Sequence, residues 1–216
     1  HRMAQVVGLY SLELNYSPLD SGPLRFVKNV EDRLLGGLLF IVFLPVMLLI
    51  AVLVKWKMGG PVLFKQHRHG IDGKCFRIYK FRTMSNHQAK YTQQATHGDP
   101  RITPLGALLR RTSLDELPQL YNVLQGRMSL VGPRPHALDH NQYYQGVIQN
   151  YMQRHRVKPG MTGWAQVNGY RGNTDTLEQM QKRVEFDLYY IDNWSLGFDL
   201  KILAMTLTRG FFNQKP

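Results

Sequence analysis

The chain has 216 residues, enough for one domain with a hydrophobic core or for such a domain with a membrane element. Lys and Arg total 27 against 15 for Asp and Glu, and the formal net charge of +12 favours anionic partners such as phosphorylated substrates, anionic lipids or nucleic acid. The single cysteine, Cys75, excludes an internal disulfide and any zinc site that takes two or more cysteines from one chain.

Residues 1–26 come before the first long apolar stretch. The chain starts with His1, Arg2 and Met3, which look like a scar left by an expression tag, so these three residues are set aside in the fold prediction. We expect the remainder of 1–26 to be a linker from an N-terminal region.

Residues 34–54 form an apolar stretch without a charged side chain, about as long as the roughly 20 residues that a helix needs to cross a bilayer. Pro45, near its middle, removes a backbone hydrogen bond and should kink the helix. A spanning helix should have its basic flank on the cytoplasmic side, whereas here both ends are basic. The flanking residues are Arg25, Lys28, Arg33, Lys55, Lys57, Lys65 and Arg68. The pattern favours a re-entrant helix and leaves a spanning helix open.

The next segment predicts a small β-hairpin. Residues 61–66 and 75–81 are short apolar runs typical of strands, and Asp72-Gly73 between them is a common hairpin turn. Residues 85–99 are polar and aperiodic, which predicts a mobile loop that could serve as a lid.

Helices are predicted over 102–109 and 115–124, because apolar residues recur there at helical spacing. A polar helix rich in Tyr and Gln is expected over 140–155, and 161–167 is a short strand or a loop. Another helix is expected over 177–190.

The last element, 194–212, mixes apolar and aromatic residues with Lys and Arg, and its apolar residues follow helical spacing. Two interpretations remain open. The segment is an interfacial helix that lies in the membrane plane, or an amphipathic helix that packs on the core.

Two adjacent carboxylates, Asp115 and Glu116, open the helix predicted over 115–124. Together with Ser113, Glu116 fits a capping box, and acids in a first turn favour the helix dipole. Taken alone, this capping role is the simpler interpretation.

Basic residues on both sides change that balance. Arg110 comes before the two carboxylates, and Arg134 follows between two prolines. Carboxylates beside guanidinium groups stay ionised. An ionised Asp can attack phosphorus as a covalent nucleophile, and a neighbouring carboxylate can hold Mg²⁺. Since Mg²⁺ and Arg stabilise a transferring phosphoryl group, 110–134 contains the parts of a phosphoryl-transfer site.

At these residues the chain resembles the bacterial sugar transferase family, the monotopic phosphoglycosyl transferases that load undecaprenyl phosphate. The resemblance extends from about residue 27 to 210. The motifs that carry it are LFKQ at 63–66, YKFRTM at 79–84, TSLDELPQL at 112–120, SLVGPRP at 129–135 and KPGMTGWAQVNG at 158–169.

The resemblance implies an α+β fold. A re-entrant membrane helix over 27–57, broken at Pro45, would precede a catalytic domain over 58–216 with a small β-hairpin and interfacial amphipathic helices. The active site would lie on the cytoplasmic face of the bacterial inner membrane.

The resemblance also implies an enzyme that transfers a hexose-1-phosphate from a UDP-sugar to undecaprenyl phosphate and releases UMP, with glucose favoured over galactose. This is the first membrane step of exopolysaccharide, capsule or O-antigen assembly. The implied partners are the UDP-sugar, undecaprenyl phosphate and membrane lipid, without nucleic acid and with a homo-oligomer left open.

The implied reaction has two steps through a covalent intermediate. Asp115 would attack the β-phosphate, and Glu116 would serve Mg²⁺ together with Asp115. Phosphates would be bound by Lys80, Arg110 and Arg134. The flanking residues Pro133 and Pro135 would support the site by fixing Arg134, since proline locks φ.

Three alternatives remain. A basic nucleic-acid-binding module would explain the charge, yet it leaves 34–54 unexplained and no familiar motif supports it. An inactive membrane scaffold would use Asp115 and Glu116 only as helix caps. A single-step transferase would use Asp115 as a base or a metal ligand.

Surface positions are expected for Arg111, Arg127, His136, His140 and His155. Trp164 and Tyr170 either stack on the uracil or lie at the membrane interface.

Overall fold

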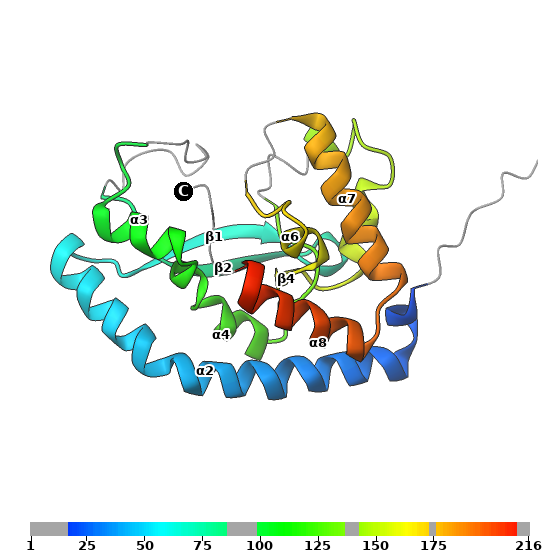
Figure 1. The fold of residues 1–216 in the computed structure, drawn as a ribbon, viewed down its shortest axis with the longest axis horizontal. Helices are drawn as coiled ribbons and strands as arrows, with labels where there is room; N and C mark the ends of the chain where they lie inside the picture. Colours follow the sequence, from blue (N-terminus) through cyan, green and yellow to red (C-terminus); the bar gives the residue numbers. More distant parts are fainter. Residues whose placement is uncertain (1–16, 86–98, 137–142, 173–175, 211–216) are drawn as a thin grey trace, which may run out of the picture.

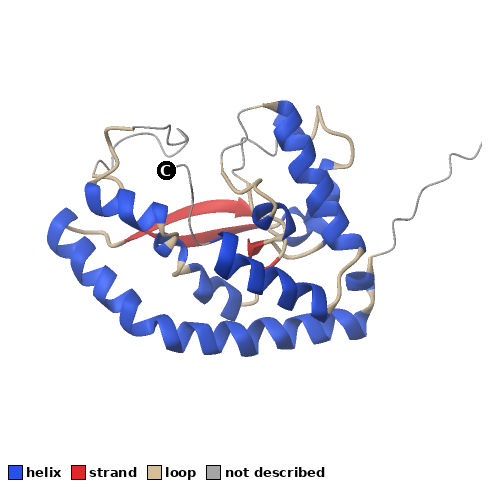
Figure 2. Cartoon of the chain, in the orientation of Figure 1, coloured by secondary structure: helices blue, strands red, loops and turns tan. Residues whose placement is uncertain are grey.

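The computed structural model describes residues 17–85, 99–136, 143–172 and 176–210. It has an α+β fold in which short strands lie within a frame of helices (Figure 1, Figure 2). The strands are β1 Leu63–His69, β2 Cys75–Phe81, β3 Ser129–Val131 and β4 Gly160–Thr162. The α-helices are α2 Gly22–Met58, α3 Pro104–Arg111, α4 Gln119–Leu124, α6 Trp164–Val167, α7 Leu177–Asp192 and α8 Leu196–Met205. Short helical turns are η1 Pro18–Asp20, η2 Ile71–Gly73, η3 Leu114–Glu116, η4 Tyr151–Arg156 and η5 Thr206–Gly210.

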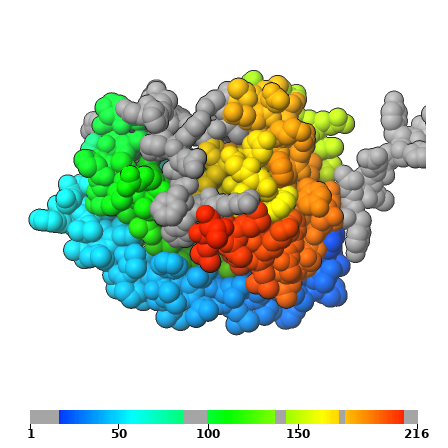
Figure 3. Space-filling view, viewed as in Figure 1, coloured from blue at the N-terminus to red at the C-terminus, as the bar shows by residue number. Residues whose placement is uncertain are grey.

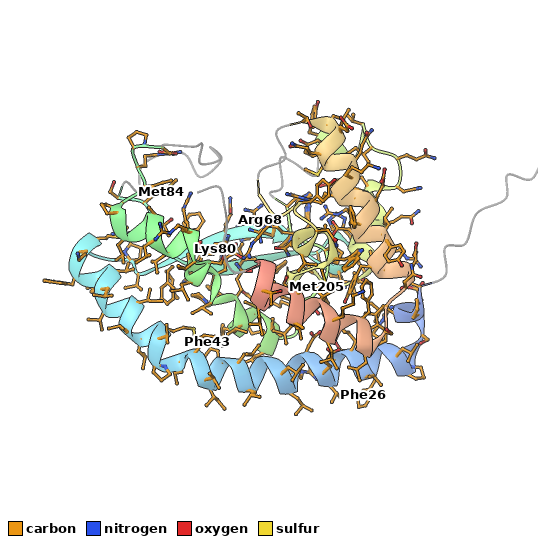
Figure 4. All side chains as sticks on the ribbon, viewed as in Figure 1. Phe26, Phe43, Arg68, Lys80, Met84 and Met205 are labelled. Carbon is orange, nitrogen blue, oxygen red and sulfur yellow. The ribbon has the colours of Figure 1, made fainter. Side chains whose placement is uncertain are left out.

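Helix α2 is the longest element, with 37 residues that include the whole predicted membrane stretch. At about 1.5 Å per residue it is roughly 55 Å long, more than the ~30 Å hydrocarbon core of a bilayer. In Figure 4 its ribbon changes direction near Phe43, two residues before Pro45. Proline inside a helix is a usual cause of such a kink. The expected kink is therefore present, although the helix continues through Pro45 without a break.

One side of α2 packs on the rest of the chain. Met47, Ile50 and Val54 are buried in the core, and a Cβ on Gly36 would lie 3.0 Å from a methyl carbon of Val123 in α4. The other side leaves large apolar residues exposed: Leu34, Leu38, Ile41, Val42, Leu48, Leu49 and Val52.

Among the described residues, α2 is the helix long and apolar enough to cross a membrane. A helix buried in a soluble core would pass the same test of length and composition, but the outer side of α2 is exposed along one edge of the molecule (Figure 3). An exposed apolar surface of this extent indicates a membrane or another apolar partner. The helix thus indicates that the chain associates with a membrane.

The predicted hairpin is confirmed. β1 and β2 are antiparallel, with Phe64 opposite Lys80 and Arg68 opposite Phe76. The connection contains Asp72 with φ 54° and Gly73 with φ 70°, the left-handed values that favour Asp and Gly in a tight turn. β1 begins and ends later than predicted, at Leu63–His69. Most of the predicted loop 85–99 lies outside the described residues.

The prediction of one helix over 115–124 is wrong in its first half. α3 ends at Arg111, a separate turn η3 contains the two carboxylates, and α4 begins only at Gln119. Ser113 has a left-handed φ of 57°, and its side chain makes no capping hydrogen bond. Pro118 has no N–H to continue a helix from η3 into α4. The capping-box interpretation is therefore wrong.

Two parallel strands position the proline-rich segment 132–135. The N–H of Gly132 donates to Thr162, and the N–H of Gly160 donates to Pro133, both at 2.9 Å. On the other side, the carboxylate of Asp32 in α2 accepts hydrogen bonds from the hydroxyl of Ser129 at 2.8 Å and from the N–H of Leu130 at 2.9 Å. Helix α2 is thereby tied to the strand that leads into Arg134.

The remaining predictions have mixed outcomes. The helix over 177–190 is confirmed as α7, and 161–167 becomes part of β4 followed by α6. The helix over 140–155 is wrong in its described part, because 143–150 forms mainly turns and η4 follows. Asn150 with φ 62° separates the two. In the last segment Ile202 is buried while 71% of Leu207 is exposed, so one side packs on the core and another faces outward.

Candidate active site

Glu116 is the centre of a cluster of cations. Its carboxylate oxygen Oε1 accepts from Lys80 Nζ at 2.8 Å and from Arg134 Nη2 at 2.7 Å. Its other oxygen, Oε2, lies 3.5 Å from Arg171 Nη2. The three cations come from β2, the segment after β3 and the loop after α6, so the fold brings together residues that are distant in sequence.

The pKa of Glu116 reflects this surrounding charge. Burial alone would raise it, but the positive charges of Arg134 and Lys80, with Arg171, outweigh burial and hold the pKa well below its usual value. Glu116 is therefore ionised throughout the physiological range. Its two oxygens are occupied by cations.

Asp115 differs from its neighbour although both are 8% exposed. No hydrogen bond to its side chain comes from the part of the chain that the structure describes. Burial raises its pKa to about 6; the charge of Lys80 opposes this rise, and that of Glu116 adds to it. Sequence reasoning predicted an ionised carboxylate here. Asp115 is mostly ionised at neutral pH, as predicted, but it is more basic than an ordinary Asp.

Arg110 lies on the Asp115 side of the site. Its Nε donates to the hydroxyl of Thr83 at 2.9 Å, and its charge acts on Asp115. Thr83 follows β2, so the hairpin and the last turn of α3 together orient this guanidinium.

Arg154 stabilises the backbone at Arg134. Arg154 Nη2 donates to the carbonyl oxygen of Arg134 at 2.8 Å, and Arg154 Nε donates to Asp187 at 2.8 Å. Pro133 and Pro135 flank Arg134, as the sequence indicated, and Gln166 accepts from Arg134 Nη1 at 3.3 Å.

The structure brings together Asp115, Glu116, Lys80 and Arg134 with Arg110 nearby, as the sequence predicted. Sequence reasoning did not select Arg171 or Arg154. Arg171 follows the last recognised motif by two residues, and a search for cations beside that motif would have found it. Arg68 was counted only as a basic flank of the membrane stretch.

The histidine interpretation needs correction. His136 is buried rather than on the surface. Its Nδ1 lies 2.6 Å from the hydroxyl oxygen of Tyr151 and 2.8 Å from Nη1 of Arg154. His155 is half-buried, and burial together with the charge of Arg154 lowers its pKa to about 4. His140 lies outside the described residues. Arg111 and Arg127 are exposed, as expected.

Trp164 packs in an aromatic group. Its ring lies 5.0 Å from that of Phe198 and 6.5 Å from that of Tyr189, and Lys201 Nζ is 5.4 Å from its centroid. Tyr170 contacts Phe186 at 5.3 Å between ring centroids. Stacking of either residue on uracil stays a prediction.

Binding of Mg²⁺ by Asp115 and Glu116 stays a prediction. The described residues contain no cluster of three or more His, Cys, Asp or Glu that would form an all-protein site. Mg²⁺ is commonly bound by one or two carboxylates together with substrate phosphates, and this pair supplies that number. With Glu116 engaged by cations, Asp115 is the more open carboxylate.

Comparison with known proteins gives consistent matches. Residues 24–213 match the model of a family described as "Bacterial sugar transferase". The chain is 52% identical to a protein of Escherichia coli (strain K12) and 50% identical to one of Klebsiella pneumoniae, over 99% of the chain and 46% of each relative. It is 53% identical to a protein of Xanthomonas campestris pv. campestris, over 84% of the chain and 38% of the relative. All three are named UDP-glucose:undecaprenyl-phosphate glucose-1-phosphate transferase. The chain thus spans less than half the length of these relatives.

Proposed function

The chain belongs to the bacterial sugar transferase family, and we propose that it transfers a hexose-1-phosphate from a UDP-sugar to undecaprenyl phosphate with release of UMP. The names of the three relatives support glucose as the sugar. The observation that carries the proposal is the contrast within the carboxylate pair. Glu116 is held by three cations, whereas Asp115 is more basic and has no described hydrogen-bond donor.

In the first step, an oxygen of the Asp115 carboxylate attacks the β-phosphorus of the UDP-sugar. A bond forms between this oxygen and phosphorus, and the bond from phosphorus to the bridging oxygen breaks. The electron pair stays on the bridging oxygen, which leaves as part of UMP. The sugar-phosphate remains on Asp115 as an acyl phosphate.

In the second step, an oxygen of the lipid phosphate attacks the same phosphorus. The bond between phosphorus and Asp115 breaks, and its electron pair restores the carboxylate. The product is a lipid diphosphate sugar. Both steps are displacements at one phosphorus, so one cluster of cations serves them both.

Lys80, Arg134 and Arg110 stabilise the negative charge that develops on the phosphoryl oxygens. Glu116 holds Lys80 and Arg134 in position by direct ion pairs. Asp115 and Glu116 would hold Mg²⁺, which when bound supplies further positive charge to the diphosphate.

We further propose that α2 is a re-entrant helix in the bacterial inner membrane and that the site faces the cytoplasm. The kink near Pro45, the exposed apolar side and the basic residues at both ends support this arrangement. Lys and Arg near membrane helices favour the cytoplasmic side. Leu196, Leu200 and Leu207, the large apolar residues that are exposed after α7 in the described part of the chain, would lie at the same interface.

The test is UMP release from a panel of UDP-sugars with undecaprenyl phosphate and Mg²⁺ in detergent. We expect UMP from UDP-glucose with the wild type and none with Asp115→Asn. Failure of the folded wild type to release UMP from any sugar in the panel would contradict the proposal.

A further inference from the structure

Arg68 lies on the same face of the hairpin as Lys80. Residues directly opposite each other in an antiparallel pair project to one face, and so do residues two apart on a strand. Lys80 in β2 is opposite Phe64 in β1, and Arg68 is four residues after Phe64 in β1. At about 3.3 Å per residue, the two positions are roughly 13 Å apart along the hairpin. Figure 4 labels Arg68 and Lys80 near each other, over the middle of the molecule.

Arg68 lies within electrostatic range of the cation cluster. The charges of Arg134 and Glu116 both act on it, and the burial of Arg68 together with the repulsion from Arg134 lowers its pKa to about 10. Arg68 therefore extends the cluster beyond the three cations that bind Glu116.

Arg68 has no carboxylate partner among the described residues. Its Nη2 donates to the neutral side-chain oxygen of Gln66 at 2.6 Å, and its buried Nε has no hydrogen-bond partner there. Lys80, Arg134 and Arg171 differ in this respect, because each is paired with Glu116. A partly buried cation without an anionic partner is unfavourable, and an anionic ligand would relieve that cost.

We propose that Arg68 binds the α-phosphate of the nucleotide sugar and then the phosphate of the departing UMP. This assignment rests on the proposed function. When the bond to the β-phosphorus breaks, its electron pair stays on the bridging oxygen, so negative charge increases on the α-phosphate. A cation that is not engaged by Glu116 is suited to that position, and Arg can contact a phosphate with two parallel donors.

The experiment compares Arg68→Gln and Arg68→Lys with Arg77→Gln as the matched control. Arg77 is exposed on the opposite face of the same hairpin, so its replacement removes one positive charge without touching the site. Three quantities are measured in detergent for each variant: kcat/KM for the UDP-sugar, kcat/KM for undecaprenyl phosphate, and the dissociation constant of UMP by calorimetry. In a two-step reaction through a covalent intermediate, each kcat/KM reports its own half-reaction.

For Arg68→Gln we expect kcat/KM for the UDP-sugar to fall about 10- to 100-fold, the range for a lost hydrogen bond to a charged group, with UMP binding weakened by a similar factor. The value for undecaprenyl phosphate should not change, and Arg77→Gln should change none of the three. Arg68→Lys retains the charge but loses the paired donors, so a smaller effect in the same direction is expected.

Two outcomes would overturn the assignment. One is unchanged UMP binding in Arg68→Gln; the other is a loss confined to undecaprenyl phosphate, which would assign Arg68 to the acceptor. If Arg68→Gln unfolds, UMP binding by Arg68→Lys decides, and affinity equal to the wild type overturns the proposal. Absence of turnover in the wild type would instead refute the proposed function, while UMP binding would still test Arg68.

Discussion

Arg154 donates a hydrogen bond of 2.8 Å to the backbone carbonyl oxygen of Arg134. The same guanidinium donates to Asp187 in α7 and contacts His136. The side chains of Arg154, Asp187 and His136 are all buried. Arg154 therefore links α7 to the segment that presents Arg134 to Glu116. Its position behind that segment makes it a positioning residue.

The first prediction concerns this link. Arg154→Leu removes the polar contacts with Arg134, Asp187 and His136 and leaves Asp187 buried without its ion pair, so we expect the free energy of unfolding to fall by about 3–5 kcal/mol. Chemical denaturation in detergent measures it. Lys182→Gln is the control, because Lys182 and Glu185 form an exposed ion pair, and such pairs contribute little to stability. Equal effects of the two changes would contradict the role of Arg154.

The second prediction is a pH dependence. The pKa of Asp115 is raised to about 6, and its attacking form is the carboxylate. As the pH falls through about 6, Asp115 becomes protonated and kcat/KM for the UDP-sugar should decrease tenfold per pH unit. Glu116 stays ionised over this range, because surrounding cations hold its pKa well below the usual value.

The pH profile of kcat/KM for the UDP-sugar is the appropriate measurement, since the diphosphate of that substrate does not titrate near pH 6. An acid limb near pH 4, the value for an unperturbed Asp, would contradict the effect of burial on Asp115.

The third prediction tests the contact between β3 and β4. A Cβ on Gly160 would lie 2.1 Å from the backbone nitrogen of Gly132, so Gly160→Ala must separate the strands and displace Arg134. We expect a loss of at least about 1–3 kcal/mol in the free energy of unfolding, with lower turnover. Gly197→Ala is the control: nothing lies within 4 Å of its Cβ, and it should stabilise α8 slightly. Retained turnover in a folded Gly160→Ala would show that this contact does not position Arg134.

The fourth prediction concerns α2. In the background Cys75→Ser, single cysteines at Gly22 and Lys57 should both react with a membrane-impermeant thiol reagent from the cytoplasmic side. Pro45→Ala removes the cause of the kink and should place the second cysteine on the opposite side or reduce membrane insertion. Reaction of the two cysteines from opposite sides in the Pro45 form would contradict the re-entrant arrangement.

Local patterns predicted the hairpin and α7, because alternation and helical spacing are properties of the contiguous sequence. They failed at 113–118, where the left-handed Ser113 and the missing N–H of Pro118 separate the carboxylates from α4. Apolar spacing cannot reveal a backbone conformation of that kind.

The sequence predicted those site residues that lie within short motifs. Asp115, Glu116 and the nearby arginines share short motifs. Arg154 contacts the backbone of Arg134 only through the fold, and burial of His136 depends on contacts with Tyr151 and Arg154. No single segment contains the information that brings these residues together.

The most direct test is to trap the covalent intermediate on Asp115. The wild type is incubated with UDP-glucose labelled in the β-phosphate, without undecaprenyl phosphate, then quenched and digested for peptide mass spectrometry. We expect a phosphohexose on the peptide that contains Asp115, lost on addition of undecaprenyl phosphate and absent from folded Asp115→Asn. The nucleophilic role of Asp115 would be contradicted if this residue carried no label although the same preparation turned over when undecaprenyl phosphate was added. Label on Asp115→Asn would contradict it as well.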